Sequence, residues 1–397
     1  MAAPFVDAAT LAQVEGALAA TITVEATSLA PESVTAAVTL DRAELLIAGE
    51  PLKQDRPTRL RLADGQFDIV DWTWSGKGNS LAISGGARLL GDRPELNAAL
   101  RGTLDLRMLG VASPDVAAGG RADFDIRAAG PLDDPAIDGE VTLRDGELAM
   151  RDPRLAVTDL VGVIALTKDR IRFVDFRASA NGGTMQLSGE VTLDAFVPAG
   201  GAIEIQGRGL AVEMPENLRS EVDLDLTLTV DAESPELAGT VTVLRGSYRA
   251  PVSLAGQLVA GVTVAAVPVE PSVLDAMRFN INVVSQDGII VDNNYGKLEL
   301  DTDLRVVGTY LLPVLAGRMT IAEGGAVFLG GQTWALERGT VDFTSATEIL
   351  PNLDLSLVTR VQQYDIRLSV TGTPDTLEAN LSSPDGISQA DAVSLLL

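Results

Sequence analysis

Apolar and polar residues alternate one by one along much of the chain. Residues 222–230 read Val-Asp-Leu-Asp-Leu-Thr-Leu-Thr-Val, with five apolar side chains on one side and four polar ones on the other. Shorter segments of the same kind are 122–126, 298–301, 353–357 and 366–370. Because successive side chains of a strand point to opposite faces, each segment predicts a strand with one dry and one wet face.

Turn signals separate these segments at short intervals. Asp64-Gly65, Asp145-Gly146 and Asp287-Gly288 are examples of dipeptides that supply the positive φ of tight hairpins. Continuous apolar runs, which are typical of parallel sheets covered on both faces, are nearly absent. The pattern therefore predicts an all-β fold with an elongated, curled sheet of antiparallel type and few short helices.

A nine-residue pattern, P-x-[IL]-x-G-x-[VM]-T-[LVI], occurs three times. Its copies begin at Pro135, Pro235 and Pro313, which are 100 and 78 residues apart. Repeats of this kind indicate a stack of strands in which each strand contacts its neighbours. Chance similarity among strands is the alternative interpretation.

A long sheet that is dry on one face cannot stay flat, because twist accumulates by roughly 20° per strand pair. It either closes around a filled core or curls into a trough. Aromatic residues make up only 4% of the chain, against 46% hydrophobic residues in all, which favours a trough lined by short aliphatic side chains over a closed core. The expected lining residues, candidates for contact with acyl chains, are Val222, Leu224, Leu226, Leu228, Val230, Val241, Val243, Met319, Ile321, Leu353, Leu355, Leu357, Ile366, Leu368 and Val370.

Helical signals are few. Leu11, Val14 and Leu18 have helical spacing within residues 5–19, and Ser388 to Asp391 resembles a capping box that opens a helix. We expect an irregular excursion over 250–275. The domain organisation we predict is a short helix or a cut end over 1–20, a repetitive β-rich body over 21–277, and a C-terminal β domain over 278–397.

The two ends resemble cut ends of a longer chain. The first twenty residues lack a basic region and contain Asp7 and Glu15, so no secretory signal is recognised. The apolar run Leu254 to Val269 is too short and too rich in glycine to span a bilayer. The chain stops at Leu395-Leu396-Leu397 with no polar tail, so we expect the last domain to be truncated at its end.

Composition removes several kinds of chemistry. The chain has no Cys and no His, which excludes disulfides, thiolate nucleophiles and the usual zinc sites. Its net charge of −25, from 55 acidic and 30 basic residues, disfavours nucleic acid binding, which requires a basic surface. No nucleotide-binding or serine hydrolase motif is present. We therefore predict no enzymatic activity, no catalytic residues, no cofactor and no metal.

Two groups of residues have possible chemistry. The carboxylate pairs Asp123/Asp125, Asp223/Asp225 and Asp301/Asp303 each lie on one strand face, as an inverting glycosidase or a calcium site requires, but a solvated strand face explains them more simply. Trp72 and Trp74 share a strand face; they either bind a sugar or a membrane interface, or fill a local core, and we favour the core.

The C-terminal third contains an ordered series of motifs. Examples are Gly317-Arg318-Met319-Thr320-Ile321, Gly339-Thr340-Val341-Asp342-Phe343 and Pro351-Asn352-Leu353-Asp354-Leu355, between Phe279-Asn280-Ile281 and Ser382-Ser383-Pro384. The series over 278–397 resembles the C-terminal domain of the TamB family of translocation and assembly module proteins, relatives of the AsmA-like bridge-type lipid transport proteins. Residues upstream fit the β-rich body of that family loosely.

The resemblance implies a β-taco, which is a curled sheet with an apolar groove. It also implies an inner-membrane anchor, absent from this chain, a path across the periplasm of a Gram-negative-type bacterium, and pairing with TamA, a BamA-like outer-membrane barrel. The implied function is to hold or conduct phospholipid between the two membranes and to support assembly or secretion of outer-membrane proteins. Two alternatives remain: a scaffold that adds strands of outer-membrane or autotransporter clients to its sheet edge, and a polysaccharide lyase or hydrolase.

Overall fold

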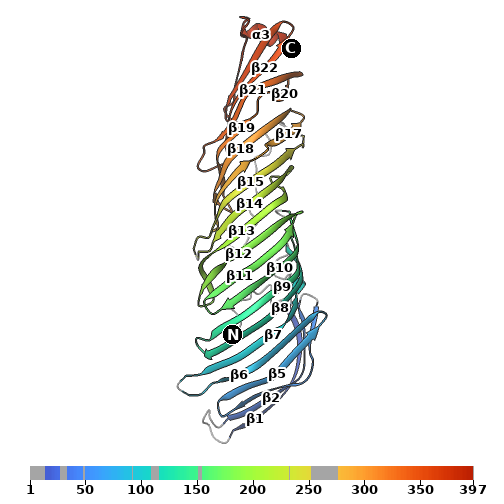
Figure 1. Ribbon diagram of the computed structural model, residues 1–397, viewed down its shortest axis with the longest axis vertical. Coiled ribbons are helices and arrows are strands. Elements are labelled where there is room, and N and C mark those ends of the chain that lie inside the picture. The colour runs from blue at the N-terminus through green and yellow to red at the C-terminus, as the bar shows by residue number, and fades with distance from the viewer. Residues whose placement is uncertain are drawn as a thin grey trace. The chain divides into compact units, whose positions relative to one another are not determined.

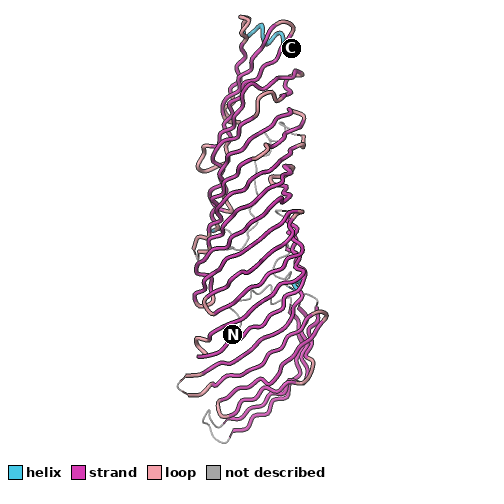
Figure 2. Tube along the Cα trace, viewed as in Figure 1, coloured by secondary structure: helices cyan, strands magenta, loops and turns pink. Residues whose placement is uncertain are grey.

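The computed structural model describes residues 14–26, 34–47, 50–91, 93–108, 116–150, 154–231, 233–251 and 276–396. Within these residues the chain forms 24 strands and one α-helix (Figures 1 and 2). The predicted all-β fold class is therefore confirmed. Two compact units divide the chain: unit 1 comprises residues 1–181 and 185–203, and unit 2 comprises 182–184 and 204–397.

Unit 1 is built mainly of antiparallel neighbours in sequence order. From β5 to β11 each strand pairs with the next, whereas β2 pairs with β1, β3 and β4. The strands are β1 (Val14–Ala26), β2 (Val34–Ile47), β3 (Glu50–Gln54), β4 (Thr58–Ala63), β5 (Gln66–Gly76), β6 (Asn79–Arg88), β7 (Glu95–Asp105), β8 (Val116–Pro131), β9 (Ala136–Met150), β10 (Leu155–Thr167) and β11 (Arg170–Ala180).

The strands β12 (Gly183–Asp194) and β13 (Val197–Glu213) contain residues of both units. Unit 2 continues with β14 (Leu218–Thr229), β15 (Glu236–Tyr248), β16 (Arg278–Ser285), β17 (Ile289–Asn293), β18 (Gly296–Thr309), β19 (Pro313–Ile321), β20 (Ala326–Leu329), β21 (Gln332–Phe343), β22 (Pro351–Val361), β23 (Tyr364–Gly372), β24 (Glu378–Ser382) and the helix α3 (Gln389–Leu396).

Unit 2 departs from the antiparallel pattern at one place. Strand β15 pairs in parallel with β16 and β17, with Val241 opposite Val283 and Ser247 opposite Ile290. The other described pairings of this unit are antiparallel. A strand with one dry face alternates in the same way in either direction, so alternation did not distinguish the parallel pair. The expected excursion over 250–275 falls, from residue 252 onward, outside the described residues.

The nine-residue repeat corresponds to a hairpin. Each copy opens the second strand, and its glycine lies opposite the residue after an aspartate of the first strand. A Cβ built on Gly239 would lie 2.2 Å from the Asp225 carbonyl oxygen, and one on Gly317 would lie 2.3 Å from that of Asp303. These two glycines also have φ of +137° and +115°, which L side chains rarely adopt. The repeat glycine is therefore required by close backbone approach.

The pair Trp72 and Trp74 belongs to a local core, as we favoured. Trp74 is 5% exposed and packs with Ala43 and Leu52. The ring centroids of the two tryptophans lie 5.3 Å apart. This cluster joins β2, β3 and β5 on the apolar side of unit 1.

The two helical signals have different outcomes. Helix α3 forms where Ser388 predicts it, and the Asp391 amide donates to the Ser388 hydroxyl at 3.2 Å. The short helix expected over 1–20 is wrong for residues 14–20, which belong to β1, and its earlier residues lie outside the described part of the chain. The β-branched run Thr21-Ile22-Thr23-Val24 continues the strand and pairs with β2, so tertiary pairing prevails over helical spacing.

Candidate functional site

One face of unit 2 is lined by apolar side chains in rows that cross the strands; we call it the dry face. Directly paired residues share a face, so the register defines each row. One row contains Leu226, Gly239, Ile281, Val306 and Leu315. A second contains Ile289, Leu300, Ile321, Gly339, Leu355, Val370 and Ala379. The even-numbered residues of β18 join both rows, so the dry face continues across unit 2.

The predicted lining residues are all at least half-buried. Six are buried and nine keep an intermediate exposure. The buried six are Val222, Val243, Ile321, Leu357, Ile366 and Val370, and the half-buried nine are Leu224, Leu226, Leu228, Val230, Val241, Met319, Leu353, Leu355 and Leu368.

Pairing brings most of these residues together across neighbouring strands. Val222 lies opposite Val243, Leu224 opposite Val241, Leu355 opposite Val370, and Leu357 opposite Leu368. Val230 lies just beyond the end of β14. The register also places Leu237, Phe279, Ile281, Leu304, Leu336 and Val341 in the same rows. These six were not among the residues predicted from the sequence. Alternation within each segment indicates that they share the apolar side of a strand, but only the strand register shows which residues they lie opposite.

The dry face has two buried threonines, Thr302 and Thr359, and the Thr359 hydroxyl donates to the Thr333 carbonyl at 2.9 Å. Thr302 is 7% exposed and lies opposite Met319, and its hydroxyl has no hydrogen-bond partner. An unpaired buried hydroxyl costs about 1–3 kcal/mol. The buried lining is thus mainly aliphatic, and of its two buried hydroxyls in the described residues only that of Thr302 has no partner.

The opposite, wet face of unit 2 carries ion pairs between strands, one between the neighbours β19 and β21 and one that spans β22. Arg318 Nε lies 2.5 Å from Asp342 Oδ1, and Arg367 Nε lies 3.0 Å from Glu337 Oε2. The hydrogen bond from Arg318 holds the pKa of Asp342 below its ordinary value, and that from Arg367 does the same for the pKa of Glu337. Both acids stay ionised at neutral pH, so each carboxylate on this face is paired with the positive charge of an arginine.

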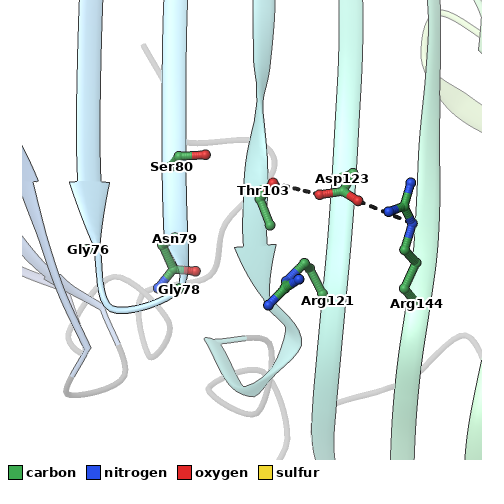
Figure 3. Close-up of a pocket in the computed structure, with 8 residues that line it drawn as sticks. All are labelled: Gly76, Gly78, Asn79, Ser80, Thr103, Arg121, Asp123 and Arg144. Carbon is green, nitrogen blue, oxygen red and sulfur yellow. Dashed lines mark hydrogen bonds and ion pairs between the residues drawn. The ribbon is translucent and has the colours of Figure 1, made fainter.

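Unit 1 also has a face that bears charged side chains, and a polar cleft of about 320 Å³ lies on it (Figure 3). Asp123 Oδ1 accepts a hydrogen bond of 2.6 Å from Thr103, and Asp123 Oδ2 lies 3.4 Å from Arg144 Nε. Figure 3 shows these three side chains on neighbouring strands, with Arg121 beside them. The carboxylate is therefore engaged by its strand neighbours, as on an ordinary solvated sheet face.

Asp125 and the pair Asp223/Asp225 have similar surroundings, whereas Asp301 accepts a hydrogen bond of 3.4 Å from Ser285. Asp125 is bonded to Arg101 at 3.1 Å and to Arg127 at 3.2 Å. Asp225 is bonded to Arg208 at 2.7 Å, and Asp223 accepts the Gly209 amide at 2.8 Å. Neutralisation by arginine favours the solvated-face interpretation over acid–base chemistry.

Within the residues that the structure describes, no group of three or more acidic side chains is placed to hold a metal ion. Nor does that part of the chain contain a helix of the length and apolarity that crossing a bilayer takes.

A repetitive sheet with one aliphatic face and one ion-paired face is typical of a β-sheet scaffold protein. Its candidate functional surface is the aliphatic face. The family model of the TamB C-terminal domain matches residues 172–397. The chain therefore belongs to the TamB family, a family of envelope-spanning, non-enzymatic transport and assembly proteins of Gram-negative bacteria that is associated with TamA. The match begins upstream of the motif series at 278–397. No curated protein matches the chain.

Proposed function

We propose that this chain is a non-enzymatic, periplasmic part of a TamB-like protein that holds or conducts phospholipid on its dry face. Acyl chains would lie along the aliphatic rows, out of water, which is worth about 0.8 kcal/mol per buried CH₂. Headgroups would stay in solvent. The proposal includes phospholipid movement between inner and outer membrane, support for assembly of outer-membrane proteins, and a TamA-like barrel as partner.

The observation that carries the proposal is the incomplete burial of the dry face. Within the described residues, each strand makes its extensive contacts with the strands hydrogen-bonded to it in the sheet. The helix α3 makes its extensive contacts with β24. Leu224, Leu226 and Leu228 accordingly remain half-buried, although they belong to the aliphatic rows. A filled core would bury such leucines almost completely.

Native mass spectrometry of the purified protein, with phosphatidylethanolamine supplied in detergent micelles, tests the proposal. We expect phospholipid adducts on the parent protein and their loss in Leu226→Lys and Leu368→Lys. Leu226 lies opposite Gly239, which has no side chain, so a lysine there faces little crowding. Circular dichroism verifies that each variant remains folded.

The matched control is Thr229→Lys, which places the same charge on the exposed last residue of β14. This variant keeps its adducts if the dry face binds the lipid. Absence of adducts on the folded parent protein, or equal adducts on Leu226→Lys and the parent, contradicts the proposal.

Strand addition is a second candidate function, favoured by the edge strand β1. Among the described pairings β1 is bonded to β2 alone. Leu18, Ile22 and Val24 of this strand are 66%, 67% and 60% exposed. An exposed apolar edge is a template for an incoming strand. Photo-crosslinks from β1 to an unfolded outer-membrane protein, on a protein that carries no lipid, would favour this function.

A further inference from the structure

The strands of unit 2 end on two opposite rims, and the register assigns each loop to one of them. Loops 310–312, 344–350 and 373–377 share a rim, because Gly308 lies opposite Pro313, Gly317 opposite Phe343, and Leu353 opposite Gly372. We call this the tip rim. The turns at 294–295, 330–331 and 362–363 lie at the other strand ends, on the turn rim.

The tip rim bears exposed apolar side chains. Tyr310, Leu311 and Leu312 are 53%, 62% and 73% exposed, Ile349 is 51% exposed and Leu377 is 49% exposed. All five belong to connections between strands, where polar residues are usual. Exposed apolar residues that gather at one place mark contact surfaces.

The turn rim has the opposite character. Its turns are Asn294-Tyr295, Gly330-Gly331 and Gln362-Gln363. Three large apolar side chains are exposed toward these ends in the described residues: Met214, before β14, Ile290, in β17, and Val393, on α3. The turns themselves are short, polar and rich in glycine.

Unit 1, taken by itself, shows the same difference. Leu89, Leu132 and Phe196 are 41%, 44% and 44% exposed, and each follows the end of a strand on one rim. Arg88 opposite Glu95 and Glu95 opposite Pro131 place the first two together. At the other rim, the β5–β6 turn is Lys77-Gly78, and Leu106 and Met108 after β7 are buried.

The apolar tips are continuous with the dry face of unit 2. The row Leu228, Leu237, Phe279 runs along its margin at the tip rim. Phe279 contacts Tyr310, with ring centroids 6.5 Å apart in an edge-to-face arrangement. The Tyr310 amide donates to the Met277 carbonyl at 3.0 Å, and the Leu312 amide to that of Thr309 at 3.2 Å. The tip is thus held in place beside the dry face.

We propose that the tips cover acyl chains, so that a phospholipid on the dry face lies with its tails toward the tip rim and its headgroup toward the turn rim. This rests on the proposed function. Aliphatic tips beside the lining remove additional CH₂ groups from water. The polar turns at the other rim leave a headgroup hydrated. The difference between the rims therefore orients the lipid across the sheet.

Two photoreactive phosphatidylethanolamines test the orientation on the full chain. One carries a diazirine near the end of an acyl chain, and the other carries it on the headgroup. After irradiation, peptide mass spectrometry locates the labels. We expect the tail probe to label 309–313 and 344–350 at least about fivefold more than 294–295 and 362–363, and the headgroup probe to show the reverse preference.

A variant pair tests the side chains themselves. Leu311→Ser with Leu312→Ser should lower tail-probe labelling on the remaining tip, 344–350, about threefold without changing the unfolding midpoint, since both leucines are exposed. Gln362→Ser with Gln363→Ser, on the turn rim, should change neither quantity.

Three outcomes overturn the orientation: both probes label both rims equally, the preference is reversed, or light scattering shows a dimer that the leucine variant dissociates. In the first two cases lipid still binds, and the proposed function stands. Absence of any label, together with absence of lipid adducts in native mass spectrometry, refutes the proposed function as well.

Discussion

The two faces of unit 2 are built from the same strands and behave in opposite ways. In β18, Leu298, Leu300 and Leu304 point to the dry face, whereas Glu299, Asp301 and Arg305 point to the wet face. The dry side contributes by removing area from water, at about 25 cal/mol per Å². The wet side contributes through exposed ion pairs, each worth about 0–1 kcal/mol. Neighbouring residues in the chain should therefore tolerate change very differently.

The largest effect is expected where a charge is placed on the buried dry side. Leu336 is 2% exposed, and Leu336→Asp should lower the free energy of unfolding of unit 2 by more than about 3 kcal/mol, because the carboxylate has no partner there. Its neighbour Ala335 is exposed on the other face, and Ala335→Asp should cost less than about 0.5 kcal/mol. Urea unfolding followed by circular dichroism measures both. Equal losses would show that the two faces are not distinct.

A smaller effect is expected where the dry face has no side chain. Gly239→Ala places a Cβ against the Asp225 carbonyl at a φ of +137°, and should destabilise by about 2–3 kcal/mol. Gly119→Ala is the control, since its Cβ would meet its nearest neighbour at 3.5 Å. The same unfolding experiment compares them. A Gly239 variant as stable as the parent would mean that the strands separate readily at the repeat.

The smallest effect is expected on the wet face. The pKa values of Glu337 and Asp342 lie below the ordinary 4.5 and 3.8, so both contribute stability above those values and lose it as pH falls through their lowered pKa. Glu337→Gln with Asp342→Asn should flatten the decline of stability below about pH 4.5. Unfolding midpoints between pH 6 and pH 3 measure the slope.

The control for the wet face removes two carboxylates from loops, Glu348→Gln with Asp375→Asn, at the same change in net charge. A slope that this control flattens as much as the Glu337/Asp342 variant would assign the effect to overall charge rather than to the arginine pairs.

Much of the fold could be predicted from alternation and turn residues. The dry residues Leu357 and Ile366 were expected inside, and they are 1% and 0% exposed. The repeat glycines were identified from sequence, although their reason, the approach of the Asp225 and Asp303 carbonyls, required coordinates. Alternation within a segment shows which of its residues share a strand face, because this depends on the strand alone and not on the strand beside it.

What could not be predicted depends on strand order and direction. The parallel pairing of β15 with β16 has the same alternation as an antiparallel one. The gathering of Leu312 and Ile349 on one rim depends on the direction of every strand between them, so the sequence shows only isolated apolar loop residues. The helical spacing of Val14 and Leu18 was misleading because an edge strand of small residues has a weak alternation of its own.

The hairpin behind the nine-residue repeat has a consequence for how such proteins change in length. Each copy joins its own aspartate-bearing strand to a glycine-bearing one and leaves on the rim where it entered. Gain or loss of a whole hairpin therefore keeps every later strand in phase, with aliphatic side chains still on the same side. Two strands add roughly 10 Å to the sheet. The sheets of relatives should thus differ in length by whole hairpins, in increments of this size.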